Sequence, residues 1–219
     1  MGAGPPILGF DTTAARCAAV LLCGDVVLAA RDEEMGRGHA ERLMPMIAEV
    51  LGEAGMEARD LVALGVGTGP GNFTGTRIAV AAARGLALSL GIPAVGVSDL
   101  EALACGTGPE PTLACLDARA GRLYLQGFGG PPADPVLLSI GELADAGLPR
   151  GATCLGDHAE LVAEATGGRA AAPAFPTAEA VARIAAERFR RADLPRPAPV
   201  YLRLADAAPP AEAPPVLLP

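Results

Sequence analysis

The chain has 219 residues, 51% of them hydrophobic, and its 17 basic against 25 acidic residues give a formal net charge of −8. This length allows one large domain or two small lobes around a buried core. The acidic balance, with only 3% aromatic residues, excludes nucleic acid as a ligand of the isolated chain, because such proteins carry a basic face and stacking rings. All 17 basic residues are arginines, so lysine Schiff-base chemistry is excluded as well.

The cysteines and the N-terminus indicate a cytoplasmic protein. The five cysteines include no Cys-x-x-Cys pair. This pattern predicts that they are small core residues of a protein in a reducing compartment. The N-terminus has no basic region of a secretory signal. The most apolar span, residues 78–97, contains Arg84 and Pro93, so we expect no membrane span.

Three strands and a helix are predicted at the start of the chain. Residues 7–11 form an apolar run that ends in Asp11, and residues 16–23 and 26–31 flank a two-residue turn of hairpin type. A helix then begins near Gly38 and His39. Its apolar residues recur at helical spacing and form a stripe of Leu43, Met46, Ile47, Val50 and Leu51.

A glycine loop between a strand and a helix dominates residues 65–93. An apolar run over 61–66 leads into Gly67, Gly69, Gly71 and Gly75, and a helical pattern follows as far as Gly91. Such a loop can hold an anion at the helix N-terminus, or it can be a joint that lets helices pack closely. No Walker lysine follows the last glycine, which favours packing.

The helix after this loop has a flank of small residues that predicts close approach of a partner helix. The flank consists of Gly75, Ala79, Ala82, Ala83 and Leu86. A strand over 94–97 and a short helix begun by Ser98 follow. The segment 106–111 is rich in Gly and Pro, so we divide the chain into lobes 1–105 and 111–205 and a Pro/Ala-rich tail 206–219.

The second lobe repeats the start of the first at an offset of 106 residues. The run 7–11 falls on 113–117, which places Asp117 where Asp11 stands, and Arg122 falls on Arg16. Strands over 123–128 and 153–156, helices after Ser139 and over 159–165 and 177–191, and a docked segment 200–202 complete the lobe. The prediction is a duplicated α/β fold, two lobes each with a mixed sheet flanked by helices.

The residues for catalysis are mostly missing, and we expect no catalytic residue and no metal site. His39 has Leu43 rather than a second histidine four residues later. The candidates for ligand binding are Asp11, Thr12 and Asp117, since aspartates ending the first strand of each lobe would face a cleft where two-lobed phosphotransferases hold nucleotide and magnesium. Thr13 and Arg119 stand where glycine would admit phosphate, and the aspartates as caps of local turns are an equally open interpretation.

Four segments resemble the TsaB (YeaZ) family: ILGFDTT at 7–13, the glycine loop and helix at 67–98, LDARAGRLY at 116–124 and VYLR at 200–203. The resemblance implies a duplicated actin-like, hexokinase-like (ASKHA) fold. It also implies a non-catalytic relative of TsaD that needs no cofactor. Such a chain pairs with TsaD, is joined by the ATPase TsaE, and forms a homodimer when alone.

In the family, the complex receives the product of TsaC and transfers threonylcarbamoyl to N6 of adenosine 37. The modified tRNAs are those that read ANN codons. The resemblance implies that tRNA binds to this chain only through the complex. The family's contact lies on the first-lobe helices, which implies an interface of Leu43, Met46, Ile47, Val50, Gly75, Arg77, Ala79, Ala82, Ala83 and Leu86. The rival interpretation is an enzyme, either an actin-like ATPase or an M22-type metallopeptidase.

Overall fold

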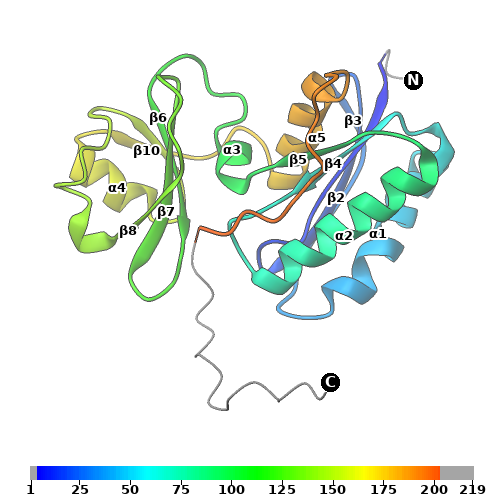
Figure 1. Cartoon of the computed structure of the whole chain (residues 1–219), viewed down its shortest axis with the longest axis horizontal. Coiled ribbons are helices and arrows are strands. Elements are labelled where there is room, and N and C mark those ends of the chain that lie inside the picture. The colour runs from blue at the N-terminus through cyan, green and yellow to red at the C-terminus, as the bar shows by residue number, and fades with distance from the viewer. Residues whose placement is uncertain (1–3, 203–219) are drawn as a thin grey trace, which may run out of the picture.

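The computed structural model describes residues 4–202 and contains two five-stranded sheets, one in each lobe (Figure 1). The first sheet has the order β3-β2-β1-β4-β5, made from β1 (Pro6–Asp11), β2 (Arg16–Cys23), β3 (Val26–Glu34), β4 (Ala63–Gly67) and β5 (Ala94–Val97). The second has the order β10-β9-β6-β7-β8, made from β6 (Thr112–Asp117), β7 (Arg122–Phe128), β8 (Val136–Ser139), β9 (Thr153–Gly156) and β10 (Arg169–Ala171).

The two sheets repeat one topology, which confirms the predicted duplication. β1 pairs antiparallel with β2 and parallel with β4, and β6 pairs antiparallel with β7 and parallel with β9. The bounds of β1 and β6 are separated by the 106 residues found in the sequence. The predicted α/β class with two mixed sheets is therefore correct. The short strands β8 and β10 were not predicted.

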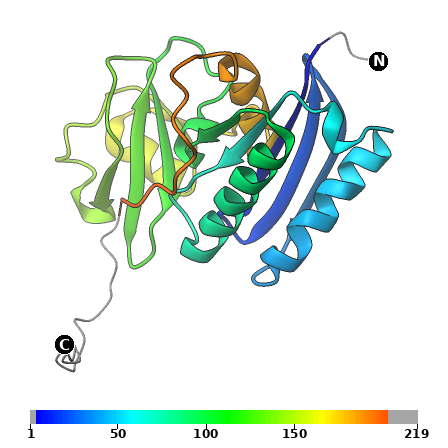
Figure 2. The same cartoon turned by 45° about the vertical axis from the view of Figure 1, so that its right-hand side comes forward.

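Helices α1 (His39–Glu53) and α2 (Phe73–Leu90) lie side by side on one face of the first sheet (Figure 2). Asn72 begins α2, because its side chain accepts hydrogen bonds from the backbone N–H groups of Thr74 and Gly75, both at 3.0 Å. Gly91 ends α2 in the left-handed region, with a φ of 66°.

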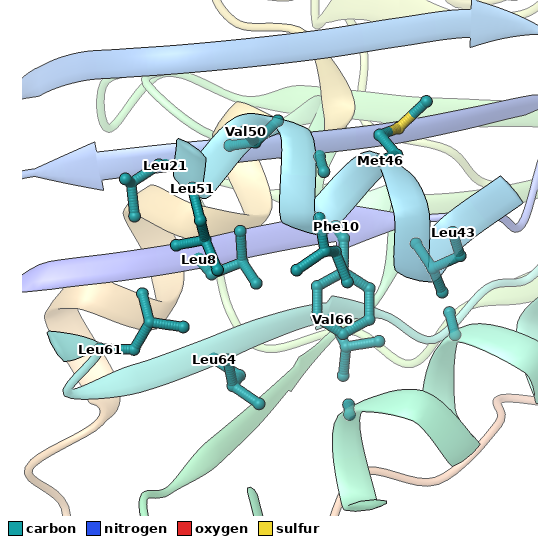
Figure 3. Close-up of a cluster of buried hydrophobic side chains, with 14 of the residues drawn as sticks. Leu8, Phe10, Leu21, Leu43, Met46, Val50, Leu51, Leu61, Leu64 and Val66 are labelled. Atoms are coloured by element: carbon teal, nitrogen blue, oxygen red, sulfur yellow. The ribbon is translucent and has the colours of Figure 1, made fainter. Parts of the chain in front are cut away.

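The apolar stripe of α1 is buried in the core of its own lobe, not on a partner surface. Leu43, Met46, Ile47 and Val50 are at most 4% exposed, and they pack on strand residues such as Leu8 and Phe10 (Figure 3). The expected contact of these four side chains with a partner is corrected here, because the first sheet already covers them. An amphipathic helix on a sheet buries its apolar face in this way.

The last helix, α5 (Thr177–Arg188), belongs to the first lobe, which corrects the division at 111–205. It covers the opposite face of the first sheet from α1 and α2, where Val181, Ile184 and Ala185 pack with Ile7 and Val95. The chain thus leaves the first lobe after β5, builds the second sheet and returns. The second sheet has α4 (Ala159–Thr166) on one face, against β9 and β10.

The short helix α3 (Asp99–Leu103) lies between the lobes (Figure 1). Ser98 caps it as predicted, since its hydroxyl accepts a hydrogen bond from the N–H of Glu101 at 3.1 Å. Leu100 packs against Ala114 and Tyr124 of the second sheet, whereas Ala102 packs in the core below α5. Two turns of 3-10 helix, η1 (Ala58–Asp60) and η2 (Ile140–Glu142), complete the structure, and η2 stands where the sequence predicted the helix after Ser139.

Gly9 and Gly65 explain how α5 fits on the sheet. A Cβ atom on Gly9 would lie 2.5 Å from the carbonyl oxygen of Ala178 and 2.7 Å from the Cβ of Ala182, and one on Gly65 would lie 2.7 Å from the carbonyl oxygen of Val181. Glycine within a strand often marks such a close approach of another backbone. The two glycines therefore let the backbone of α5 approach the sheet directly.

We predict that Gly9→Ala lowers the free energy of unfolding by about 2 kcal/mol, because the new methyl group meets backbone atoms that can move only with the whole helix. Urea denaturation followed by circular dichroism measures the change. Gly52→Ala is the matched control, since a Cβ there meets no atom within 4 Å and alanine favours the helix. Equal stability of Gly9→Ala and the native chain would contradict this account of α5.

Candidate functional site

The strongest polar cluster lies where three parallel strands of the first sheet end. Asp11 ends β1, the glycine loop follows β4, and Asp99 comes shortly after β5. Ligands of open α/β sheets bind at this edge. Here, however, the two carboxyl groups are buried, with Asp11 3% and Asp99 7% exposed.

Thr13 joins the two carboxyl groups. Its hydroxyl lies 3.0 Å from Oδ2 of Asp11 and also contacts Oδ2 of Asp99, while its backbone N–H donates to the carboxylate of Asp11 at 3.1–3.2 Å. The other oxygen of Asp99, Oδ1, is buried without a hydrogen-bond partner among the described residues. A single hydroxyl hydrogen lies between two carboxyl groups, and this arrangement favours a proton on one of them.

The electrostatics of the pair favour this proton. Burial raises the pKa of Asp11 to about 6, although the hydrogen bonds from Thr13 partly oppose the shift. Burial, together with the nearby charge of Asp11, raises the pKa of Asp99 well above its ordinary value. A carboxyl group that holds its proton is a poor ligand for magnesium, which prefers charged carboxylates.

The glycine loop packs onto the turn after β1. A Cβ on Gly71 or Gly75 would overlap the carbonyl oxygens of Thr13 and Thr12, and one on Gly67 would overlap the carboxylate of Asp11. The hydroxyl of Thr12 donates to the carbonyl oxygen of Gly75 at 2.7 Å. The loop thus takes the space that a phosphate group would need, and of the two interpretations of the glycines the structure favours packing.

The aspartates act as turn caps, which is the other interpretation that the sequence left open. The N–H of Arg119 donates to Oδ1 of Asp117 at 2.9 Å, just as the N–H of Thr13 donates to Asp11. Asp117 is exposed on the second lobe, and its own N–H donates to Asp157. No hydrogen bond joins Asp117 to Asp11 in residues 4–202.

The histidine at the start of α1 is buried, and it belongs to no group of metal-ligating side chains in residues 4–202. His39 is 6% exposed, and Nε2 has no partner in the described part of the chain. Leu43, in the second place of the histidine pattern, lies in the core. Across residues 4–202, no group of three or more His, Cys, Asp or Glu side chains could hold a metal ion.

Asp99 is the residue that sequence reasoning missed. It directly follows Ser98, and the sequence indicated only a helix start at that point. The available signal was the parallel order of β1, β4 and β5, because the carboxyl ends of parallel strands meet at one edge. Strand order is itself a property of the fold, so the signal appears only once the sheet is known.

The predicted interface residues of α2 divide into three groups. Gly75, Ala79 and Ala83 are buried under the helix, Ala82 and Leu86 are half-buried beside α1, and Arg77 is exposed. The side chains of the buried group are covered by their own chain. An interface on α2 would have to use the exposed residues on the side of the helix that faces away from the sheet, such as Arg77, Ala81 and Leu88.

The chain is similar to proteins of tRNA modification and to solved structures with the same fold. Residues 31–130 match the family model of TsaD, described as tRNA N6-adenosine threonylcarbamoyltransferase. The tRNA threonylcarbamoyladenosine biosynthesis protein TsaB of Escherichia coli is 40% identical over 122 residues, which are 54% of this chain and 52% of that protein. The chain thus spans about half the length of this curated relative.

Other relatives match over nearly the full chain. An uncharacterized protein of Mycobacterium tuberculosis is 35% identical over 214 residues, 93% of this chain and 94% of that protein. A crystal structure from Pseudomonas aeruginosa, of an uncharacterized protein with similarity to peptidase YEAZ, has a TM-score of 0.75 at 30% identity. The match covers 91% of this chain and 100% of the chain in that structure.

None of the helices in residues 4–202 has the length and apolar character that a membrane span requires.

We predict a pH-dependent effect of Asp99→Asn. Since the pKa values of both carboxyl groups are raised, the folded protein binds more protons than the unfolded chain, and the stability that the pair contributes falls as the pH rises above about 4 and through about 6. Asparagine removes one ionisation. The free energy of unfolding of the variant should therefore nearly equal that of the native chain at about pH 4.5 and exceed it by about 1–3 kcal/mol at about pH 8.

Thermal unfolding of both proteins across this pH range measures the gain. Thr13→Val is the control, since it keeps both carboxyl groups but removes the hydroxyl between them, and it should be less stable than the native chain at every pH. A difference between Asp99→Asn and the native chain that does not change with pH would show that the pair does not titrate as described.

Proposed function

Because the chain belongs to the TsaB (YeaZ) family, we propose that it is a non-catalytic partner subunit in the synthesis of threonylcarbamoyladenosine on tRNA. In this proposal it pairs with a TsaD subunit and the ATPase TsaE joins them. The complex accepts the product of TsaC and modifies adenosine 37 of tRNAs that read ANN codons. Alone the chain forms a homodimer, and tRNA reaches it only through the complex.

The observation that carries the proposal is the outer face of α1 and α2. Leu88 is 86% and Met44 45% exposed, and their exposed neighbours Ala48, Ala81 and Gly85 are small and uncharged. Arg42 lies on another side of α1 and pairs with Glu33 and Glu49, whereas the exposed Glu41 stands three residues before Met44, on the same side as Met44. A face on which small residues surround two exposed large apolar ones, with charges such as Glu41 and Arg84 beside them, is typical of a surface that another protein covers.

Gly85 adds an independent argument. It lies inside α2, where glycine costs about 1 kcal/mol relative to alanine. A Cβ there would meet no atom within 4 Å, so nothing in this chain requires glycine. A second chain packed closely against α2 would require it, since small residues let helices approach each other.

The same helices are present in the partner that we propose. The matched TsaD model spans residues 31–130, which include all of α1 and α2. A TsaD subunit would then carry a related pair of helices, and two such pairs can pack with near twofold symmetry. A homodimer would use the same face twice.

The absence of catalysis in this chain is part of the proposal. Asp11 is buried beside Asp99, and the glycine loop fills the space above the turn after β1. These observations support a subunit that binds its partner without turning over a nucleotide. Neither the ATPase nor the metallopeptidase interpretation gains support from a described side chain.

We predict that Leu88→Glu weakens binding to the TsaD subunit of the same organism by tenfold or more, because it replaces the most exposed large apolar side chain of the proposed face by a charged one. Isothermal titration calorimetry measures the affinity, and sedimentation equilibrium measures the homodimer. Leu161→Glu is the matched control, since Leu161 is an exposed leucine of a helix on the second lobe. Unchanged affinity in Leu88→Glu would contradict the proposed face.

We also predict that the isolated chain gives no saturable heat on titration with ATP and magnesium, because the loop and the turn leave no room between them for a phosphate. Saturable binding that Asp11→Ala abolishes would favour the nucleotide-cleaving alternative. Binding that Asp11→Ala leaves intact would place a nucleotide elsewhere and also contradict the prediction.

A further inference from the structure

The chain returns to α2 after its last helix. The segment 196–202, orange in Figure 2, runs between the lobes and along the outer flank of α2. The carbonyl oxygen of Pro197 accepts a hydrogen bond from Nε of Arg84 at 2.7 Å, and the N–H of Val200 donates to the carbonyl oxygen of Thr68 at 2.8 Å. Leu202 packs with the core cluster of the second sheet. The docking predicted for 200–202 is thus confirmed.

This segment places Tyr201 beside the first turn of α2. The rings of Phe73 and Tyr201 have centroids 5.2 Å apart, and the guanidinium of Arg77 lies 3.7 Å from the centroid of Phe73. Nε of Arg77 donates to the hydroxyl of Tyr201 at 2.8 Å. We call these three residues the aromatic clamp. Each of its rings is 50% exposed, although the whole chain has only seven phenylalanines and tyrosines.

The aromatic clamp continues the face proposed above. Phe73, Arg77, Ala81 and Leu88 are all exposed on α2, and the first three are spaced by four residues, so they follow one side of the helix. Seven large apolar side chains are exposed in residues 4–202, and four of them belong to α1, α2 or the returning segment: Met44, Phe73, Leu88 and Tyr201. The exposed apolar surface is therefore concentrated on this side of the first lobe.

The side chains of the clamp are those that contribute most at protein interfaces. Tyrosine and arginine are enriched among residues whose truncation costs most binding energy. Arg77 is already held by Phe73 and Tyr201, so little side-chain freedom remains to be lost on binding. Only Nε is used within the described chain, which leaves the terminal nitrogens in a fork that fits a carboxylate.

We propose that the aromatic clamp is a second anchor of the partner surface, built by the returning segment 196–202, and that it receives an aspartate or glutamate flanked by an apolar side chain of the TsaD subunit. The inference rests on the proposed function, because the occupant is the same partner. It extends the contact from the two helices to the C-terminal part of the chain.

The test compares Arg77→Ala and Tyr201→Ala with Arg190→Ala in the full-length chain by calorimetry against the TsaD subunit. The guanidinium of Arg190 is exposed and lies 4.4 Å from the centroid of the Phe189 ring. Arg190→Ala therefore removes a similar stacking contact outside the proposed partner surface. We expect about tenfold weaker binding for the first two variants and native affinity for Arg190→Ala. Tyr201→Phe, which keeps the ring, should lose less affinity than Tyr201→Ala.

The outcomes separate the two proposals. If Leu88→Glu weakens binding while Arg77→Ala and Tyr201→Ala bind as the native chain does, the clamp is not an anchor and the proposed function stands. If Leu88→Glu also binds normally, the helix face itself is wrong. If Arg190→Ala weakens binding as much as Arg77→Ala, the effect comes from general loss of stacking and the clamp proposal fails. Native unfolding temperatures of the variants ensure that the affinities compare folded proteins.

Discussion

A carboxyl group in the interior of a protein must find a cation or keep its proton, and no ion pair within the described chain includes Asp11 or Asp99. The shared contact through Thr13 resolves this conflict by joining the end of β1 to the start of α3. Because α3 is the element between the lobes, this contact joins the edge of the first sheet to the point at which the first lobe meets the second. The glycine loop can then close over the same turn.

In open α/β sheets, the edge where the strands end is the usual place of a ligand. The likeness to the 2-hydroxyglutaryl-CoA dehydratase component of Acidaminococcus fermentans, with a TM-score of 0.55 at 12% identity, concerns the fold alone. In the present chain, the edge is occupied by its own residues: Thr12 and Thr13 contact the glycine loop, and Val200 is hydrogen-bonded to Thr68. Contacts within the chain join the two lobes, among them the packing of Leu100 and Leu202 on the second sheet.

Most of the local structure could be predicted from the sequence, because its signals act over a few residues. Asn72 and Ser98 begin their helices, and the repeat at 106 residues gave the duplication. The placement of α5 could not be predicted, since an amphipathic helix near the end of the chain fits either sheet equally well. Only Gly9 and Gly65 mark the face that receives it, and glycine in a strand has several causes.

The predicted interface shows why the functional surface was harder to predict from the sequence than the fold. Leu43 and Val50 form a helical apolar stripe, and such a stripe looks the same whether a sheet or a partner covers it. The sequence placed them on a partner surface and the sheet covers them. Leu88 and Tyr201 cannot be told from their apolar neighbours in the sequence, because Leu86 and Leu90 flank the first and Val200 and Leu202 flank the second. Their exposure becomes visible only when the surrounding chain is in place.

The return of α5 to the first sheet has a consequence for biosynthesis. The strands of that sheet lie within residues 6–97, but Ile7, Val95 and Val97 stay uncovered on one face until residues 177–188 have been translated. A nascent chain would therefore expose this apolar face to the ribosome surface and to chaperones while the whole second lobe is made. Emergence of α5 from the ribosome, and not that of β5, is the moment at which the N-terminal lobe can close.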